Sequence, residues 1–208
     1  MNIDEAVDSF YKQWDQFGSA HIKSLINDLP DWQKILGMLN SETRLDDWTD
    51  MAGDSRWEIK YKNIFAVKKI EYDKEGNPSV ESDATFFFSL FFESNKIGLK
   101  LSKSLEDQVN VMSNRLNIDT DYNSVKISLS PKHVPYESHV WHTCIIQLQG
   151  INNWSLRDTR SQFEKEYLLE PGDCLFFKEG IEHRVTNDEP RSSLVGRFTF
   201  NEGGNKNA

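Results

Sequence analysis

Glu137 and His139 are two side chains of metal-ligand type separated by a single residue. Side chains at positions i and i+2 of an extended segment point to the same side, so one segment can present both to the same ion. His183 opens a later segment with strand character, just after a turn at Gly180. Two histidines and one carboxylate on one face of an ion, with the other positions open, suit non-haem Fe(II) oxygen chemistry. The sequence therefore predicts a mononuclear metal site at these three ligands.

The remaining histidines offer one competing ligand set. His142 is three residues from His139 and would face the other way on a strand, so the set of His139, His142 and His183 is the weaker alternative. His142 is otherwise expected to pack against a ligand or to line the substrate cavity. His133 is interpreted as a residue of the rim, and His21, on a segment with helical spacing, as an ordinary surface histidine. Imidazole must be neutral to bind a metal, so binding should weaken at acid pH.

The strands that must position the ligands lie mainly in the C-terminal half. Short apolar runs alternate with turn residues there, which is typical of a barrel or a sandwich. The expected strands cover residues 125–129, 143–148, 154–157, 174–177, 183–186 and 194–200. Strands are also expected within 57–72 and at 85–92, with a turn at 74–78.

Helical spacing of apolar residues dominates the N-terminal part instead. It predicts helices at residues 3–17 and 21–29, a third helix capped by Asp31, and another over 104–116 with Ser104 as its cap. The composite prediction is an α+β fold in one domain over residues 1–208. That domain has a helical region over 1–55, a barrel over about 56–200 and a flexible tail over 201–208.

Three segments of the C-terminal half carry a family resemblance. They are VKISLSP (125–131), PYESHVWHTCIIQLQG (135–150) followed by Trp154, and LEPGDCLFF (169–177) followed by Gly180 and His183. In these motifs the chain resembles the JmjC-like cupin oxygenases, the Fe(II)/2-oxoglutarate hydroxylases of the cupin superfamily. The resemblance implies a double-stranded β-helix (cupin or jelly-roll) barrel that uses Fe(II) and 2-oxoglutarate. It covers the last two fifths of the chain, and the N-terminal half matches only the family's habit of a helical preface.

The order of the first two ligands departs from the family pattern. The family has a histidine and then an acid, whereas this chain has Glu137 and then His139. A working site with permuted ligands and a site that has drifted both fit this order. The second alternative leaves a non-catalytic cupin that binds a ligand or a partner.

The expected anchor for 2-oxoglutarate also departs from the family. The resemblance implies a lysine or arginine just after Gly150, but residues 151–153 are Ile-Asn-Asn. Arg197, which lies 14 residues after His183, is the leading substitute. A carboxylate would give a buried arginine the partner that it needs. Weaker candidates are Arg157 and Lys126, and neutral hydrogen bonds are expected from Asn152, Ser128 and Thr143. Without an anchor, a metal-dependent cupin dioxygenase or isomerase that does not use 2-oxoglutarate is the alternative.

Composition narrows the range of partners. The net charge of −9 argues against sequence-independent binding of nucleic acid. The first residues have no apolar leader, and no apolar run is long enough to span a membrane, so a cytoplasmic protein is expected. Cys144 and Cys174 are interpreted as buried thiols rather than a disulfide.

Taken together, these features predict an oxygenase that hydroxylates a C–H bond of a small molecule, an amino acid or a peptide. Trp141 and Tyr136 flank the proposed ligands and are expected to contact the substrate or co-substrate. The sequence leaves a homodimer open and does not name the substrate.

Overall fold

The computed structural model describes residues 2–37, 56–59, 67–72, 78–79, 87–91, 102–128, 132–133, 136–158 and 163–201. The helices are α1 (Ile3–Phe17), α2 (Trp32–Gly37) and α3 (Lys103–Arg115). The strands are β1 (Ser19–Ile22), β2 (Arg56–Ile59), β3 (Val67–Tyr72), β4 (Pro78–Ser79), β5 (Phe87–Phe91), β6 (Ile118–Ser128), β7 (Lys132–His133), β8 (His142–Gln149), β9 (Asn152–Asp158), β10 (Phe163–Leu169), β11 (Cys174–Phe177), β12 (Glu182–Asn187) and β13 (Arg191–Phe200).

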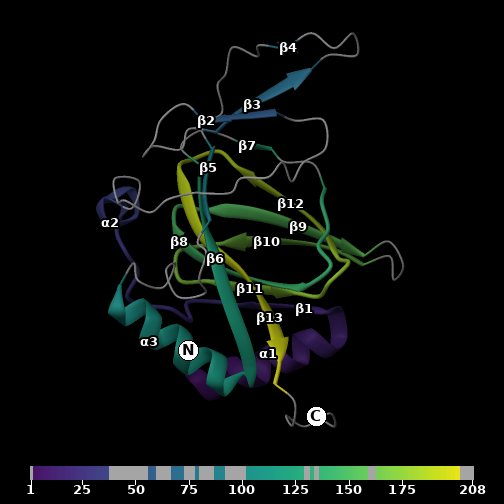
Figure 1. Ribbon diagram of the computed structural model, residues 1–208. Helices are drawn as coiled ribbons and strands as arrows, with labels where there is room; N and C mark the ends of the chain where they lie inside the picture. Colours follow the sequence, from purple (N-terminus) through teal and green to yellow (C-terminus); the bar gives the residue numbers. More distant parts are fainter. Residues whose placement is uncertain are drawn as a thin grey trace.

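Two antiparallel sheets form a jelly-roll β-sandwich (Figure 1). The larger sheet has the order β1-β11-β8-β13-β6-β5-β3-β2, with β4 paired to β3, and the smaller sheet has the order β10-β9-β12-β7. From β8 onward the chain passes repeatedly from one sheet to the other, as in β8 to β9 and in β11 to β12 to β13. This alternation encloses a space between the sheets, and it confirms the expected α+β fold with a jelly-roll barrel.

Helix α1 has clear start and stop signals. Asn2 caps its first turn, and Glu5 returns a hydrogen bond to the backbone N–H of Asn2, which is a complete capping box. Gly18 ends the helix in the left-handed conformation at a φ of 62°. The predicted helix over 3–17 is therefore confirmed.

Helix α1 buries its apolar face on the outer side of the larger sheet (Figure 1). Phe10 is fully buried, with its ring edge-on to Phe176 at a centroid distance of 5.2 Å. Trp14 packs edge-on against Phe198 of β13 at 5.5 Å. Helix α3 adds Leu105, Val109 and Met112 to the same core. This outer core therefore joins both helices to β8, β11 and β13.

Two helix predictions need correction. The predicted helix over 21–29 is absent. Its first two residues belong instead to β1, which pairs with β11 from Ser19 opposite Phe177 to Ile22 opposite Cys174. Pairing with the open edge of β11 outweighs the local helical spacing. Helix α3 is capped by Ser102, whose hydroxyl accepts from the backbone N–H of Leu105, and not by Ser104.

Other sequence predictions stand as follows. A helix follows Asp31, and strands lie within 57–72 and 85–92 as expected. Strand β10 was not expected. The predicted turn at 74–78 lies outside the described residues except for its last residue, and residues 202–208 of the predicted tail lie wholly outside them. Both cysteines are free and buried, which confirms the prediction. Among the described helices, none is both long and apolar enough to cross a membrane.

Candidate metal centre

The segment that carries Glu137 and His139 is held in place by backbone hydrogen bonds. The N–H of Glu137 donates to the carbonyl of His183 at 2.9 Å, and the N–H of His183 donates to the carbonyl of Glu137 at 2.7 Å. The carbonyl of His139 accepts from the N–H of Gly180 at 2.8 Å. Gly180 has a φ of 76°, a conformation that glycine adopts without strain. The turn before β12 therefore fixes both the first ligand pair and the third ligand.

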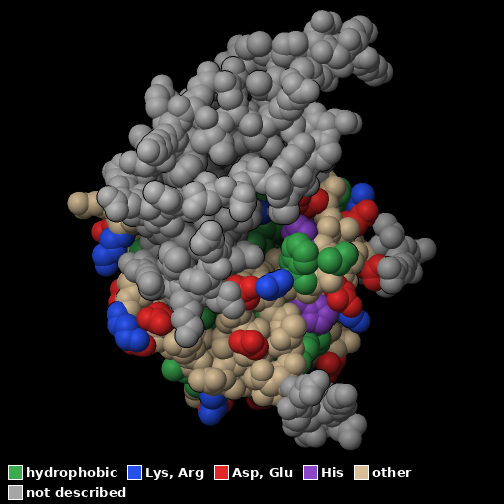
Figure 2. All heavy atoms as spheres, in the orientation of Figure 1, with side chains coloured by type: hydrophobic (Ala, Val, Ile, Leu, Met, Phe, Trp, Pro, Cys, Tyr) green, Lys and Arg blue, Asp and Glu red, His purple; other side chains and the backbone are tan. Residues whose placement is uncertain are grey.

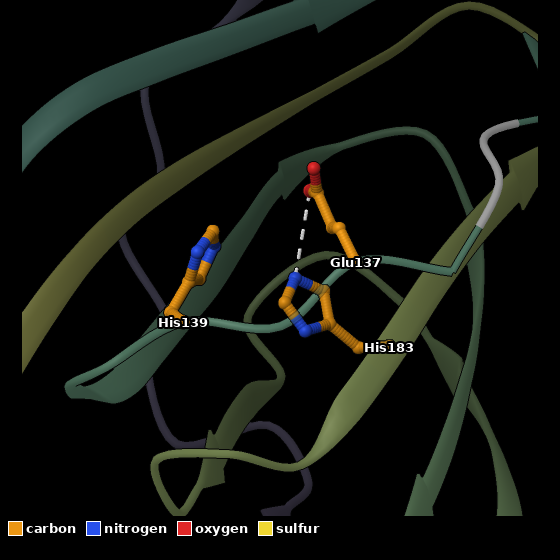
Figure 3. Close-up of side chains that lie close together, drawn as sticks. All are labelled: Glu137, His139 and His183. Atoms are coloured by element: carbon orange, nitrogen blue, oxygen red, sulfur yellow. Dashed lines mark ion pairs between the residues drawn. The ribbon is translucent and has the colours of Figure 1, made fainter. Parts of the chain in front are cut away.

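The three predicted ligands converge on one point (Figure 3). Their candidate ligand atoms all lie within 4.8 Å of one another. Ligand atoms that each lie about 2.0–2.2 Å from a shared ion are themselves about 3 Å or more apart, so small side-chain rotations suffice to bring these three atoms into coordinating positions. The donor set of two imidazoles and one carboxylate fits a divalent transition metal. The structure therefore brings together the residues that the sequence predicted to share a metal.

His183 is the most enclosed of the three ligands. Its side chain is 3% exposed and packs against the rings of Trp154, at a centroid distance of 5.9 Å, and Phe177, at 4.8 Å. Its Nδ1 lies 3.3 Å from the carbonyl of Ile181. A proton on Nδ1 satisfies this carbonyl and leaves Nε2, which faces Glu137 at 3.5 Å, as the ligand atom. Second partners of this kind orient metal-binding histidines in proteins.

Electrostatics keep the other two ligands in their metal-binding protonation states. The hydrogen bond with His183 lowers the pKa of Glu137 to about 2, so this carboxylate is ionised at neutral pH. Burial, together with the nearby charge of His183, lowers the pKa of His139 to about 4, so this imidazole is neutral. A metal cation would be held by the Glu137 carboxylate and by Nε2 of His183, which lie 3.5 Å apart.

Three buried polar side chains from β8, β9 and β13 form a hydrogen-bonded group. Gln147, Asn152 and Ser193, here called the inner polar cluster, are all fully buried. The Asn152 amide donates to Gln147 at 2.8 Å and to Ser193 at 3.0 Å, and the Ser193 hydroxyl donates to Gln147 at 2.7 Å. Two more residues that were predicted to give neutral hydrogen bonds, Thr143 and Ser128, are buried on β8 and β6. The cluster therefore links β8, β9 and β13.

Of the residues predicted to contact the substrate, Trp141 lies next to the ligands. Its ring stacks on that of His139 at a centroid distance of 4.9 Å and an interplanar angle of 13°. Trp141 is 39% exposed and the neighbouring Val140 is 84% exposed. Figure 2 shows hydrophobic side chains at the surface beside histidines in this view of the molecule. Contact with a substrate stays a prediction for Trp141.

Tyr136 and His142 lie elsewhere than expected. The Tyr136 ring lies under the guanidinium groups of Arg157, at 3.8 Å, and Arg184, at 4.8 Å. Because adjacent residues of an extended segment face opposite ways, Tyr136 points away from the space that Glu137 faces. His142 packs among Trp14, Phe198 and Phe200 of the outer core, and its Nδ1 accepts from the N–H of Glu179 at 3.1 Å. The competing ligand set with His142 is therefore wrong.

The expectation that Arg197 points into the barrel is also wrong. The pairing of β13 with β6 shifts register between Val195 and Arg197. Beyond this shift the Arg197 side chain is 59% exposed, and its Nε donates to Asp121 at 2.8 Å. Ion pairing at the surface avoids the cost of desolvating the guanidinium. Arg157, a weaker candidate, is likewise engaged outside the barrel by Tyr136 and Glu182.

Two positively charged side chains lie on the side of the larger sheet that faces the smaller one. The sequence motifs indicated one of them but not the other. Lys126, the other weaker candidate, lies opposite Ser193 of the inner polar cluster in the pairing of β6 and β13. Arg191 lies two residues before Ser193 on the same strand and is 1% exposed. Residues opposite each other, or two apart on a strand, share a face of the sheet. The signal for Arg191 was available in the sequence, as a cation that begins a strand composed mostly of small and apolar residues.

Comparison with known proteins gives a likeness of fold alone. No family model matches the chain, and no curated protein matches it significantly in sequence. The non-haem α-ketoglutarate-dependent epimerase SnoN from nogalamycin biosynthesis aligns over 95% of this chain and 83% of its own, with a TM-score of 0.51 and 10% identity. YcfD, a ribosomal oxygenase from Escherichia coli, aligns over 95% of this chain and 58% of its own, with a TM-score of 0.52 and 16% identity. The chain shares the jelly-roll fold of these proteins.

Proposed function

We propose that this protein is an Fe(II)- and 2-oxoglutarate-dependent oxygenase that hydroxylates a C–H bond of a small molecule, an amino acid or a peptide. The observation that carries the proposal is the convergence of Glu137, His139 and His183 within the barrel. Three ligands on one side of an ion leave its other positions open for a chelating co-substrate and for dioxygen. Two solved structures with this fold are described as an α-ketoglutarate-dependent epimerase and a ribosomal oxygenase.

Each part of the site has a role in this proposal. Glu137, His139 and His183 would hold the iron. When bound, Fe(II) together with 2-oxoglutarate and dioxygen supplies the oxidising power, while the co-substrate is converted to succinate and carbon dioxide. Trp154 and Phe177 enclose His183 and exclude water from one side of the centre. Trp141, stacked on His139 and exposed on its other side, is placed to contact a substrate at the mouth.

A second function is favoured by one observation. The turn after Gly150, where the family resemblance implied a cation, holds the neutral residues 151–153, and the amide of Asn152 is engaged with Gln147 and Ser193. A metal-dependent cupin dioxygenase or isomerase without 2-oxoglutarate would need no cation there. The swapped order of Glu137 and His139 is also compatible with a metal-free binding protein.

Anaerobic addition of Fe(II) and 2-oxoglutarate separates these functions. We expect the weak visible charge-transfer band of the iron chelate in the parent protein and its loss in His183→Ala. Admission of oxygen should then release succinate even without a substrate. Bound iron without the band would contradict the use of 2-oxoglutarate, and no bound iron would contradict the oxygenase altogether. Glu182→Ala, on the same strand but paired with Arg157 outside the barrel, serves as the matched control.

A further inference from the structure

The two imidazole ligands of the metal centre are supported in different ways. His183 packs against Trp154 and Phe177, and its Nδ1 lies 3.3 Å from the carbonyl of Ile181. A second partner of this kind is the usual device that orients a metal-binding histidine. His139 is only partly buried, and within the described ranges of the chain its imidazole makes no hydrogen bond. Among these residues, something other than a hydrogen bond must therefore set the orientation of the His139 ring.

Trp141 provides a flat surface against the His139 ring. The two rings are stacked, with centroids 4.9 Å apart and an interplanar angle of 13°. The torsion that turns an imidazole about its Cβ–Cγ bond is broad by itself, but a parallel ring at this distance restricts it, because a large rotation would drive an edge of the imidazole into the indole. The ring of His183 lies 4.8 Å away and is tilted by 57°, and it belongs to a fellow ligand. The stack therefore limits the plane in which His139 can reach the metal.

Trp141 is in turn held by the start of β8. The next residue, His142, lies opposite Phe198 of β13 in the backbone pairing. Thr143 follows and lies opposite Phe177 of β11. From its first residues β8 is therefore flanked by a strand on each side. The indole extends from a fixed point of the larger sheet and gives the imidazole a firm support.

We propose that Trp141 is a positioning residue, which holds His139 in its metal-binding orientation by stacking, in place of a hydrogen-bonded partner like that of His183. The inference rests on the metal centre of the proposed function, but not on 2-oxoglutarate or on hydroxylation. It gives the indole a role in metal binding that is separate from contact with a substrate. Because Trp141 is 39% exposed, its replacement should leave the fold almost unchanged and act on the centre instead.

The first test measures the Fe(II) affinity of the metal-free protein under anaerobic conditions, without a co-substrate. Trp141→Ala should bind Fe(II) about three- to tenfold more weakly than the parent, since a stacked aromatic pair contributes about that much. Trp141→Phe keeps a flat ring and should bind within about twofold of the parent. Val140→Ala is the matched control, because it removes an 84% exposed apolar side chain from the same loop, and it should bind Fe(II) as the parent does.

A double-mutant cycle distinguishes positioning from a merely structural role. If Trp141 acts through His139, then Trp141→Ala should weaken Fe(II) binding no further in a His139→Ala background. An equal loss with and without His139 would overturn the proposal. Failure of Trp141→Phe to restore the affinity would also overturn it, and this comparison stays decisive where His139→Ala binds Fe(II) too weakly to measure.

The same titrations keep the inference separate from the proposed function. If the parent binds Fe(II) and Trp141→Ala binds it equally well, the positioning role is refuted while the metal centre stands. If the parent binds no Fe(II), the proposed function fails, and the positioning role fails with it.

Discussion

The two faces of strand β8 contrast sharply. Cys144 and Ile146 face outward into the apolar core beneath α1 and α3, where burial raises the pKa of the Cys144 thiol to about 12 and keeps it protonated. Ile145 and Gln147 alternate with them and face the space between the sheets. Lys126 and Arg191 lie on the same inner side. The outer face has the apolar composition of an ordinary protein core. The inner face instead carries charged side chains, which packing alone does not require.

The histidines repeat this contrast. His142 lies on the outer face among aromatic rings and accepts a backbone hydrogen bond, which is sufficient to explain its burial. His139 and His183 lie on the inner side with Glu137, their ring centroids 4.8 Å apart. The same residue type therefore serves packing on one face and faces a ligand site on the other. Three variants sharpen this comparison, and we take them in order of expected effect.

Phe10→Ala has the largest expected effect, and it acts on the outer face. Phe10 is fully buried against Phe176, so its removal leaves a cavity in the outer core. We expect a loss of about 3–5 kcal/mol in the free energy of unfolding. Urea unfolding would measure it, and the folded fraction should bind Fe(II) as the parent does. A loss below about 1 kcal/mol would contradict the role of this core.

Asp173→Asn tests the joint between β1 and the turn before β11. Burial would raise the pKa of Asp173, but hydrogen bonds from His21, at 2.9 Å, and from the backbone of Ser24 and Glu170 outweigh it and lower the pKa. A lowered pKa means that the ionised carboxylate stabilises the fold above the unfolded pKa of about 3.9, and that this contribution is lost as the pH falls through the folded value.

The substitution should therefore cost about 1–3 kcal/mol near neutral pH, and the difference from the parent should shrink at acid pH. Urea unfolding across this pH range measures both. Asp107→Asn, which removes an exposed carboxylate paired with Lys103, is the control and should have little effect at any pH. A difference that stays constant down to acid pH would show that the charge of Asp173 does not act as described.

Lys126→Met has the smallest expected effect on stability, and it acts on the inner face. Burial lowers the pKa of Lys126, so the folded state disfavours its charge. Replacing the ammonium with an apolar side chain of similar size should leave the ligand-free protein at least as stable as the parent. The same unfolding measurement checks this. A loss of more than about 2 kcal/mol would mean that Lys126 has a partner within the fold.

The sequence was sufficient to single out the three candidate ligands that lie together in the structure, and to predict most of the strands. The i, i+2 spacing of Glu137 and His139 was informative because their orientation depends on local geometry alone. The same alternation predicted that His142 faces away. Residues whose surroundings depend on distant strands were harder, and His21 was misplaced because its strand exists only through pairing with β11. Arg197 was misplaced because a register shift and the carboxylate of Asp121 decide its direction.

The most direct test of the central claim is an anaerobic Fe(II) titration of the parent beside His183→Ala and His142→Ala. We predict that the parent binds a single Fe(II) per chain and that His142→Ala binds it equally well. His183→Ala should bind Fe(II) at least about 100-fold more weakly, since it loses a ligand and even the loss of a ligand's supporting partner costs 10–100-fold. Equal iron affinity in His183→Ala and the parent would contradict a metal centre at Glu137, His139 and His183.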